Sequence, residues 1–209
     1  KELGWKSVYA FDNEVLGAKG IVLDGKAYVE YPVVRDYLND RFYVDYNENV
    51  LLYTLPEGLI TAGVGSAEYT LQKEKKSEGY TILKMEGNVA YIALEFVQKY
   101  TNMDFHTYEK TEEEPGRVMI VSDWGETTVA TVKRDTQVRY RGGVKSPILT
   151  DVSKKEKVIV IEDEDNWKKV RTEDGYIGYI KTSCLKNITM ETTSRERSEE
   201  HTSELQSLQ

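Results

Sequence analysis

The stretch from Trp167 to Lys181, WKKVRTEDGYIGYIK, constrains the fold more than any other part of this chain. Asp174-Gly175 supplies the positive backbone dihedral angles that a tight hairpin turn needs. On both sides of this turn, apolar and aromatic residues alternate with charged ones, which is typical of half-buried strands. We therefore predict a β-hairpin in which Trp167 and Val170 face a hydrophobic core and Gly178 lets the second strand pass close to a neighbouring strand.

The formal charge of −8 is distributed unevenly along the chain. Residues 1–126 contain 13 Lys and Arg against 22 Asp and Glu, or −9, whereas residues 127–190 contain 13 against 9, or +4. The last nineteen residues contain 2 against 5, or −3. A basic C-terminal region on an acidic chain favours an anionic partner for that region. A nucleic acid is not the expected partner, because no basic patch is interleaved with aromatic residues in the way that such sites require.

Cysteine usage and hydropathy exclude several classes of protein. Cys184 is the only cysteine, which excludes an internal disulfide and a multi-cysteine metal site, and we expect it to be a small buried residue. No run of 18 apolar residues is present, so the sequence contains no candidate transmembrane helix. Because the chain begins at Lys1 rather than Met, we expect that the native N-terminus is missing, and any signal peptide or membrane anchor would lie there.

The first half of the chain contains an internal repeat with a constant offset of 63 residues. Residues 28–45 (YVEYPVVRDYLNDRFYVD) align with residues 91–108 (YIALEFVQKYTNMDFHTY), and five aligned pairs are identical. Each copy reads as strand, turn, short strand, helix of about ten residues, strand, turn and strand, the helix being indicated by one apolar face. A helix of three turns buries too little surface alone, so each helix packs on its own strands or the two copies share a core.

This repeated pattern resembles the copper amine oxidase N-terminal-like domain, a stalk module of bacterial envelope proteins. The resemblance covers residues 18–123, with one copy at 18–57 and the other at 80–123. It implies α+β stalk repeats in which a short helix packs on antiparallel strands. The family name brings no metal chemistry here, because copper needs clustered His, Cys or Met ligands and this region offers His106 alone. We expect no metal site.

A second pattern begins at Thr127. Its residues, in order, are Thr136-x-Val138-Arg139, Ser146-Pro147-Ile148, Val158–Ile161, Asn166-Trp167-x-x-Val170, Asp174-Gly175-Tyr176-x-Gly178-Tyr179-Ile180 and Leu185. Their order and spacing resemble the bacterial SH3-like domain, which implies a small all-β barrel over residues 127–186. The sequence departs from the family in one turn, where Lys155-Glu156-Lys157 replaces a usual glycine. Glu156 would then adopt that turn's backbone, or the turn is of another type.

The same resemblance implies a ligand. Members of this family commonly bind cell-wall peptides or glycans through the loop after the first strand and through nearby aromatic residues. The candidate binding residues here are Arg139, Tyr140, Arg141, Tyr176 and Tyr179. Aromatic faces together with guanidinium groups suit a sugar ring or a carboxylated stem peptide, so a cell-wall glycan or stem peptide is the expected partner. We interpret Trp167 as a core residue rather than as a ligand platform.

The sequence contains no recognisable catalytic constellation. A Ser-His-Asp or Cys-His arrangement cannot be built from one credible histidine, and no phosphate-binding loop or metal-spaced His cluster is present. The consecutive carboxylates Glu162–Asp165 could suggest a calcium site, but consecutive side chains point in different directions and are typical of a solvated turn. We therefore expect no catalytic residues, no metal ligands and no cofactor.

The order of these segments resembles the N-terminal part of a bacterial family-18 glycoside hydrolase. Residues 187–196 would then be a linker to a hydrolase domain lost by truncation, and residues 197–209 resemble a translated sequencing adapter rather than a folded segment. The expected function is a non-catalytic segment outside the cytoplasm of a bacterium, which binds the cell wall and presents that hydrolase. Two alternatives remain open: a stand-alone wall-binding or sensor protein, and the targeting segment of a cysteine-type wall peptidase.

Overall fold

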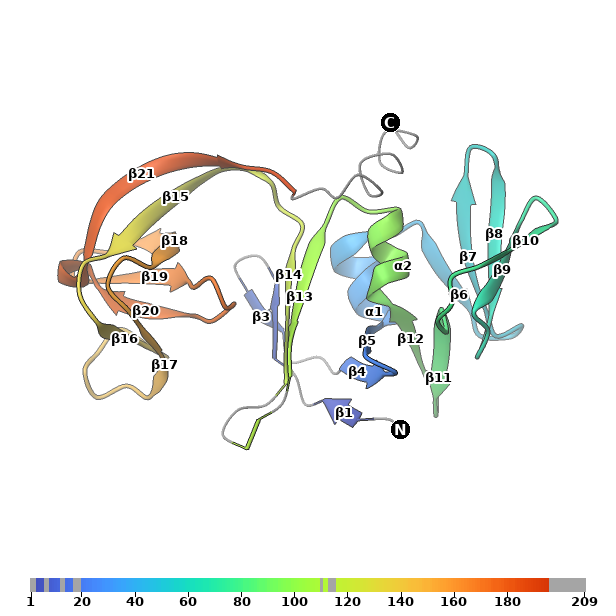
Figure 1. Ribbon diagram of the computed structural model, residues 1–209, viewed down its shortest axis with the longest axis horizontal. Coiled ribbons are helices and arrows are strands. Elements are labelled where there is room, and N and C mark those ends of the chain that lie inside the picture. Colours follow the sequence, from blue (N-terminus) through green and yellow to red (C-terminus); the bar gives the residue numbers. More distant parts are fainter. Residues whose placement is uncertain are drawn as a thin grey trace. The chain divides into compact units, whose positions relative to one another are not determined.

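The computed structural model describes residues 3–5, 8–11, 14–16, 20–109, 111–112 and 116–195 (Figure 1). The chain forms two compact units: the first is built mainly from residues 20–117 and the second mainly from residues 118–195. No helix within the described ranges is both long enough and apolar enough to cross a membrane. Strands dominate both units, so the chain is largely β, with two short helical segments in the first unit.

A five-stranded antiparallel sheet forms the centre of the first unit. Its strands, in spatial order, are β1 (Leu3–Trp5), β4 (Gly20–Leu23), β5 (Lys26–Glu30), β12 (Val89–Ala93) and β11 (Leu83–Glu86). β11 and β12 begin 63 residues after β4 and β5, which is the offset of the sequence repeat. Val29 pairs with Ile92, the residue 63 positions after it, so equivalent strands meet in the middle of the sheet across an approximate two-fold axis.

The helical segments of the two copies are shorter than the sequence predicts. α1 (Tyr31–Val33) continues into the π-helical turn η1 (Val34–Leu38), and α2 spans Leu94–Lys99. The amide of Asn39 donates to the carbonyl of Val34 at 2.7 Å, which closes η1 with an i to i−5 hydrogen bond. α1 packs on β12, and α2 packs on both β5 and β12, so each helix contacts a strand of the other copy. Of the two arrangements left open by the sequence, the structure has the shared core.

A second sheet of the first unit is a meander of five strands. In order they are β6 (Phe42–Asp45), β7 (Val50–Leu55), β8 (Gly58–Gly63), β9 (Glu68–Leu71) and β10 (Glu74–Ser77). Residues 58–77, which the sequence repeat leaves unassigned, thus form three of these strands. β13 (Asp104–Tyr108) follows α2. His106 is exposed on β13.

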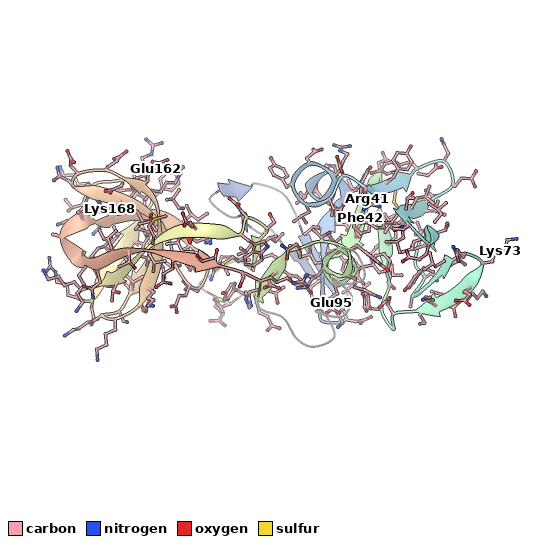
Figure 2. All side chains as sticks on the ribbon, turned by 90° about the horizontal axis from the view of Figure 1, so that it is seen from above. Arg41, Phe42, Lys73, Glu95, Glu162 and Lys168 are labelled. Atoms are coloured by element: carbon pink, nitrogen blue, oxygen red, sulfur yellow. The ribbon has the colours of Figure 1, made fainter. Side chains whose placement is uncertain are left out.

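Aromatic rings from both copies fill the core of the first unit. The rings of Phe42 and Tyr53 lie 4.4 Å apart, and Tyr53 lies 5.0 Å from Tyr100 (ring centroids). Phe96 on α2 joins the cluster 5.4 Å from Tyr100, and Figure 2 labels Phe42 among the side chains of this unit. The side-chain amide of Asn39 donates to the hydroxyl of Tyr53 at 3.2 Å and to the carbonyl of Tyr100 at 3.1 Å, which fixes the cluster between the copies.

The second unit contains a curved sheet of seven strands. In spatial order they are β17 (Ile148–Val152), β16 (Thr136–Arg139), β20 (Ile177–Lys181), β19 (Trp167–Arg171), β18 (Lys157–Asp163), β15 (Gly125–Val132) and β21 (Leu185–Thr193). A 3₁₀ turn, Thr182–Cys184, precedes β21. The hairpin of β2 (Val8–Phe11) and β3 (Glu14–Leu16) and the strand β14 (Arg117–Val121) complete this unit.

The core of the curved sheet is aliphatic. Its buried residues are Ala130, Val132, Val138, Val152, Val158, Val160, Val170, Ile180, Cys184 and Leu185. Val170 and Cys184 are therefore core residues. The predicted hairpin is present, because β19 pairs antiparallel with β20 in a register that aligns Val170 with Gly178.

Two details differ from the sequence predictions. Residues 187–193, part of the segment 187–196 expected to be linker, continue β21, and residues 189–193 pair with β15, Met190 lying opposite Thr128. The segment was not predicted as a strand because its apolar alternation is limited to Ile188 and Met190. Both of these residues are exposed in the structure. In the turn before β18, Lys155 rather than Glu156 has the positive φ, 78°. The expected tail, residues 197–209, lies outside the described residues.

Candidate functional site

The outward-facing residues of β19 and β20 define the candidate site. Along β20 the buried residues Gly178 and Ile180 alternate with Tyr179 and Lys181, which face outward. Along β19, Lys168 and Val170 are buried, so Trp167 and Lys169 face outward. Successive side chains of a strand point to opposite faces. The surface next to the predicted loop is therefore built from alternate residues of this hairpin.

The prediction that Trp167 fills the core is wrong. Trp167 and Val170 are three positions apart on one strand, and an odd separation places two side chains on opposite faces of the sheet. Val170 takes the inward face. Trp167 is only partly buried and is not one of the core residues of the sheet.

Cross-strand pairing brings the outward residues into one row. Arg139 on β16 lies opposite Tyr179 on β20, and Tyr179 lies opposite Lys169 on β19. Directly opposite residues of an antiparallel pair have Cβ atoms about 5 Å apart, so these three side chains are neighbours. Trp167 and Lys181 form the adjacent pair two residues along. We name the surface made by Arg139, Tyr179, Lys169, Trp167 and Lys181 the Tyr179 face.

The loop between β16 and β17, residues 140–147, borders the Tyr179 face. The guanidinium of Arg139 donates to the carbonyl of Ser146 at 2.8 Å, and the amide of Arg141 donates to the hydroxyl of Ser146, also at 2.8 Å. The amide of Tyr140 donates to the carbonyl of Pro147 at 2.9 Å. These bonds close the loop on itself. Arg139 thus has a structural role in addition to its place on the face.

Gly142 brings this loop onto the indole of Trp167. A Cβ atom added at Gly142 would lie 3.0 Å from Cγ of Trp167, so the backbone approaches the ring as closely as glycine allows. The ammonium of Lys181 lies 6.0 Å from the centre of the same ring. Trp167 therefore has both the loop and a cation as neighbours.

Tyr140 and Arg141 project from the loop. Both are exposed, and the guanidinium of Arg141 lies 5.5 Å from the ring centre of Tyr140. A cation at this distance from an aromatic face is a weak attraction that orients both side chains. Of the five residues selected from the sequence, the structure therefore brings four into one neighbourhood: Arg139, Tyr140, Arg141 and Tyr179.

Tyr176 is the exception. Its amide donates to the hydroxyl of Thr172 at 3.0 Å, and its carbonyl accepts from the amide of Thr172 at 2.9 Å, so it belongs to the hairpin turn. It lies three residues from Tyr179, which is about 10 Å along an extended chain and an odd separation. The structure does not place Tyr176 on the Tyr179 face.

Gly178 lies where the hairpin crosses β16. An added Cβ atom would lie 2.5 Å from the carbonyl oxygen of Arg139 and 2.7 Å from Cγ1 of Val138. No side chain fits there without moving backbone. Glycine at this position therefore keeps β20 close enough to β16 for Tyr179 to stand beside Arg139.

The acidic run Glu162–Asp165 engages lysines of the neighbouring strand. The carboxylate of Glu162 lies 3.9 Å from the ammonium of Lys169, and Asp163 forms an ion pair with the buried Lys168. Glu162 and Lys168 are labelled in Figure 2. Among the described residues, no group of three or more His, Cys, Asp and Glu side chains could hold a metal ion.

Sequence reasoning missed Lys169 and Lys181 as members of the face. The signal was present, because Lys181 follows Tyr179 by two positions and therefore shares its face. Lys169 could not be found in this way, since its place beside Tyr179 depends on the register between two strands.

The comparison with protein families assigns this part of the chain. Residues 131–186 match the model of the bacterial SH3 domain. The matched range contains the Tyr179 face and the loop 140–147, so the whole candidate site lies within the SH3 domain. The comparison with curated proteins found no match. Two resemblances stay predictions. One is that of residues 18–123 to the copper amine oxidase N-terminal-like domain, and the other is that of the order of the segments along the chain to family-18 hydrolases.

Proposed function

We propose that the bacterial SH3 domain of this chain binds the bacterial cell wall through the Tyr179 face and the loop 140–147. Bacterial SH3 domains are commonly cell-wall-binding modules. The observation that supports the proposal is that Tyr179, Trp167 and Lys181 share one face of the hairpin, while the loop that carries Tyr140 and Arg141 contacts Trp167 at Gly142.

The chemistry of this surface suits the polymers of the wall. Aromatic rings offer flat apolar faces on which the CH groups of a sugar ring can pack. Arginine and lysine side chains donate hydrogen bonds to carboxylates such as those of a stem peptide, and the local net charge of +4 over residues 127–190 attracts them. The proposed ligand is therefore a wall glycan or a stem peptide.

The proposed role of the whole chain is binding rather than catalysis. The matched family is a binding module, and the candidate site contains no nucleophile paired with a base. On the resemblances stated for the sequence, the first unit would act as a stalk and the chain would hold a wall hydrolase at its substrate, outside the cytoplasm.

The test is co-sedimentation of the full chain with purified wall sacculi. Tyr140→Ala removes an exposed ring, 57% accessible, from the proposed surface, and Tyr43→Ala removes an equally exposed ring, 56%, from the first unit. We expect Tyr140→Ala to weaken binding about tenfold, as loss of an aromatic anchor does, and Tyr43→Ala to leave it unchanged. A wild-type chain that stays in the supernatant, or equal effects of the two substitutions, would contradict the proposal.

A further inference from the structure

The second unit has a pocket that is separate from the Tyr179 face. It has a volume of about 230 Å³ and lies where β15, β18 and β21 meet. Its lining includes Trp124, Glu126, Thr128, Ile161, Arg171 and Met190. Eight of its twelve lining residues lie outside the matched range 131–186, in the segments 123–128 and 190–193. The pocket is therefore made largely by the extension of this chain beyond the SH3 domain.

The strand pairing explains why the pocket forms. The last aligned pair between β15 and β18 is Thr128 with Val160, whereas β15 stays paired with β21 as far as Gly125 with Thr193. β15 and β21 thus continue as a two-stranded ribbon beyond the point where the pairing of β15 with β18 ends. Next to that point, the pairing of β18 with β19 shifts register between Val160 and Glu162. Such irregularities redirect a strand and often border binding sites.

The lining combines one aromatic residue with hydrogen-bonding groups of both charges. Trp124 offers an indole, and Ile161 and Met190 add apolar surface. Asp123 and Glu126 are acceptors, Thr128 is both donor and acceptor, and Arg171, only 9% exposed, carries several donors. Two carboxylates beside one guanidinium disfavour an anionic ligand. A neutral ligand with many hydroxyl groups can donate to the carboxylates and accept from the guanidinium.

The size of the pocket limits the ligand to one small unit. A water molecule occupies about 30 Å³ of liquid, so the pocket has room for roughly eight waters, which is close to the volume of a single sugar ring. We propose that this pocket binds one neutral sugar residue, with its CH face towards Trp124 and its hydroxyl groups towards Glu126, Thr128 and Arg171. This site is distinct from the Tyr179 face and does not depend on the wall-binding proposal.

The experiment is a titration of the full, isotope-labelled chain with free N-acetylglucosamine and, separately, with glucose, followed by amide chemical shifts. We expect saturable shifts with at least one sugar, confined to residues 123–128, 159–161, 171 and 190–193. Glu126→Gln should weaken this binding about tenfold by removing a charged acceptor, whereas Glu162→Gln, a carboxamide change on the same sheet outside the pocket, should not.

Two results would overturn the proposal: no saturable shift with either sugar, or shifts that map elsewhere or are equal in the two variants. Tyr140→Ala separates the two proposed sites. It should weaken binding to sacculi and leave the sugar titration unchanged, and a sugar titration weakened by this substitution would contradict a separate pocket.

Discussion

At the scale of single residues, the face that a side chain occupies decides its role. Trp167 and Val170 have similar sequence surroundings, yet one is at the surface against Gly142 and the other is completely buried. The difference follows from counting positions along one strand. It changes what each residue is expected to contribute, because Val170 stabilises the domain and Trp167 belongs to the proposed binding surface.

Substitution of these two residues should separate stability from binding. Trp167→Ala removes a partly exposed ring, so we expect a loss of about 1–2 kcal/mol in the free energy of unfolding and a clear loss of sacculus binding. Val170→Ala leaves a cavity in the core and should cost about 2–3 kcal/mol while binding is kept in the folded fraction. Urea denaturation and co-sedimentation measure both. An unfolded Trp167→Ala variant beside a fully stable Val170→Ala variant would reverse the assignment.

Tyr28 makes the stability of the first unit decrease at high pH. Its hydroxyl donates to the carbonyl of Thr81 at 2.5 Å, and burial, followed by the carboxylates of Asp24 and Glu95, raises its pKa to about 12. The neutral phenol is therefore favoured in the folded state. Its contribution to stability is complete below the unfolded pKa of about 10 and is lost as the pH rises from 10 towards 12.

Tyr28→Phe tests this dependence. Near pH 8 the variant should be about 1 kcal/mol less stable than the wild type, because the carbonyl of Thr81 loses its donor. The gap should narrow above about pH 10, since phenylalanine does not titrate while the wild type loses stability. Chemical denaturation at a series of pH values measures the gap. A difference that stays constant across this range would rule out the raised pKa.

At the scale of elements, the backbone of the turn before β18 is strained at one residue. Lys155 has φ of 78°, in the left-handed region that favours glycine, while its amide donates to the carbonyl of Val132 at 2.9 Å and holds the turn in place. Lys155→Gly should therefore stabilise the SH3 domain by about 0.5–1 kcal/mol. The control Lys154→Gly, one residue earlier and without a positive φ, should stabilise nothing. Equal shifts in the denaturation midpoint would show that the turn is not strained.

The elements could be predicted from sequence where a pattern was local. The strands that flank the two-fold axis occur at the repeat offset, and the Asp174-Gly175 hairpin is present. β9 and β10 were missed because their two-residue loop, Gln72-Lys73, has positive φ at both residues without the usual Asn or Gly. Four of the five selected binding residues come together. The position of Tyr179 beside Arg139 and Lys169, however, depends on pairing between separate strands, and no local sequence pattern encodes that pairing.

At the scale of the whole molecule, the two units divide the charge and the proposed tasks. The acidic first unit joins two copies of one motif through the Val29–Ile92 pair and a shared aromatic core. The cationic and aromatic side chains of the candidate site belong to the second unit. This division agrees with a first unit that supports and a second unit that binds. Which unit contacts the ligand is therefore the observation that tests this division.

Amide chemical-shift mapping of the full chain with soluble wall fragments measures that location directly. Stem peptides and short glycans, added in separate titrations, identify which part of the wall is recognised. We predict saturable shifts at residues 139–142, 167–169 and 179–181 with at least one of them. Shifts confined to residues 20–109, or none with either fragment, would contradict wall binding by the Tyr179 face.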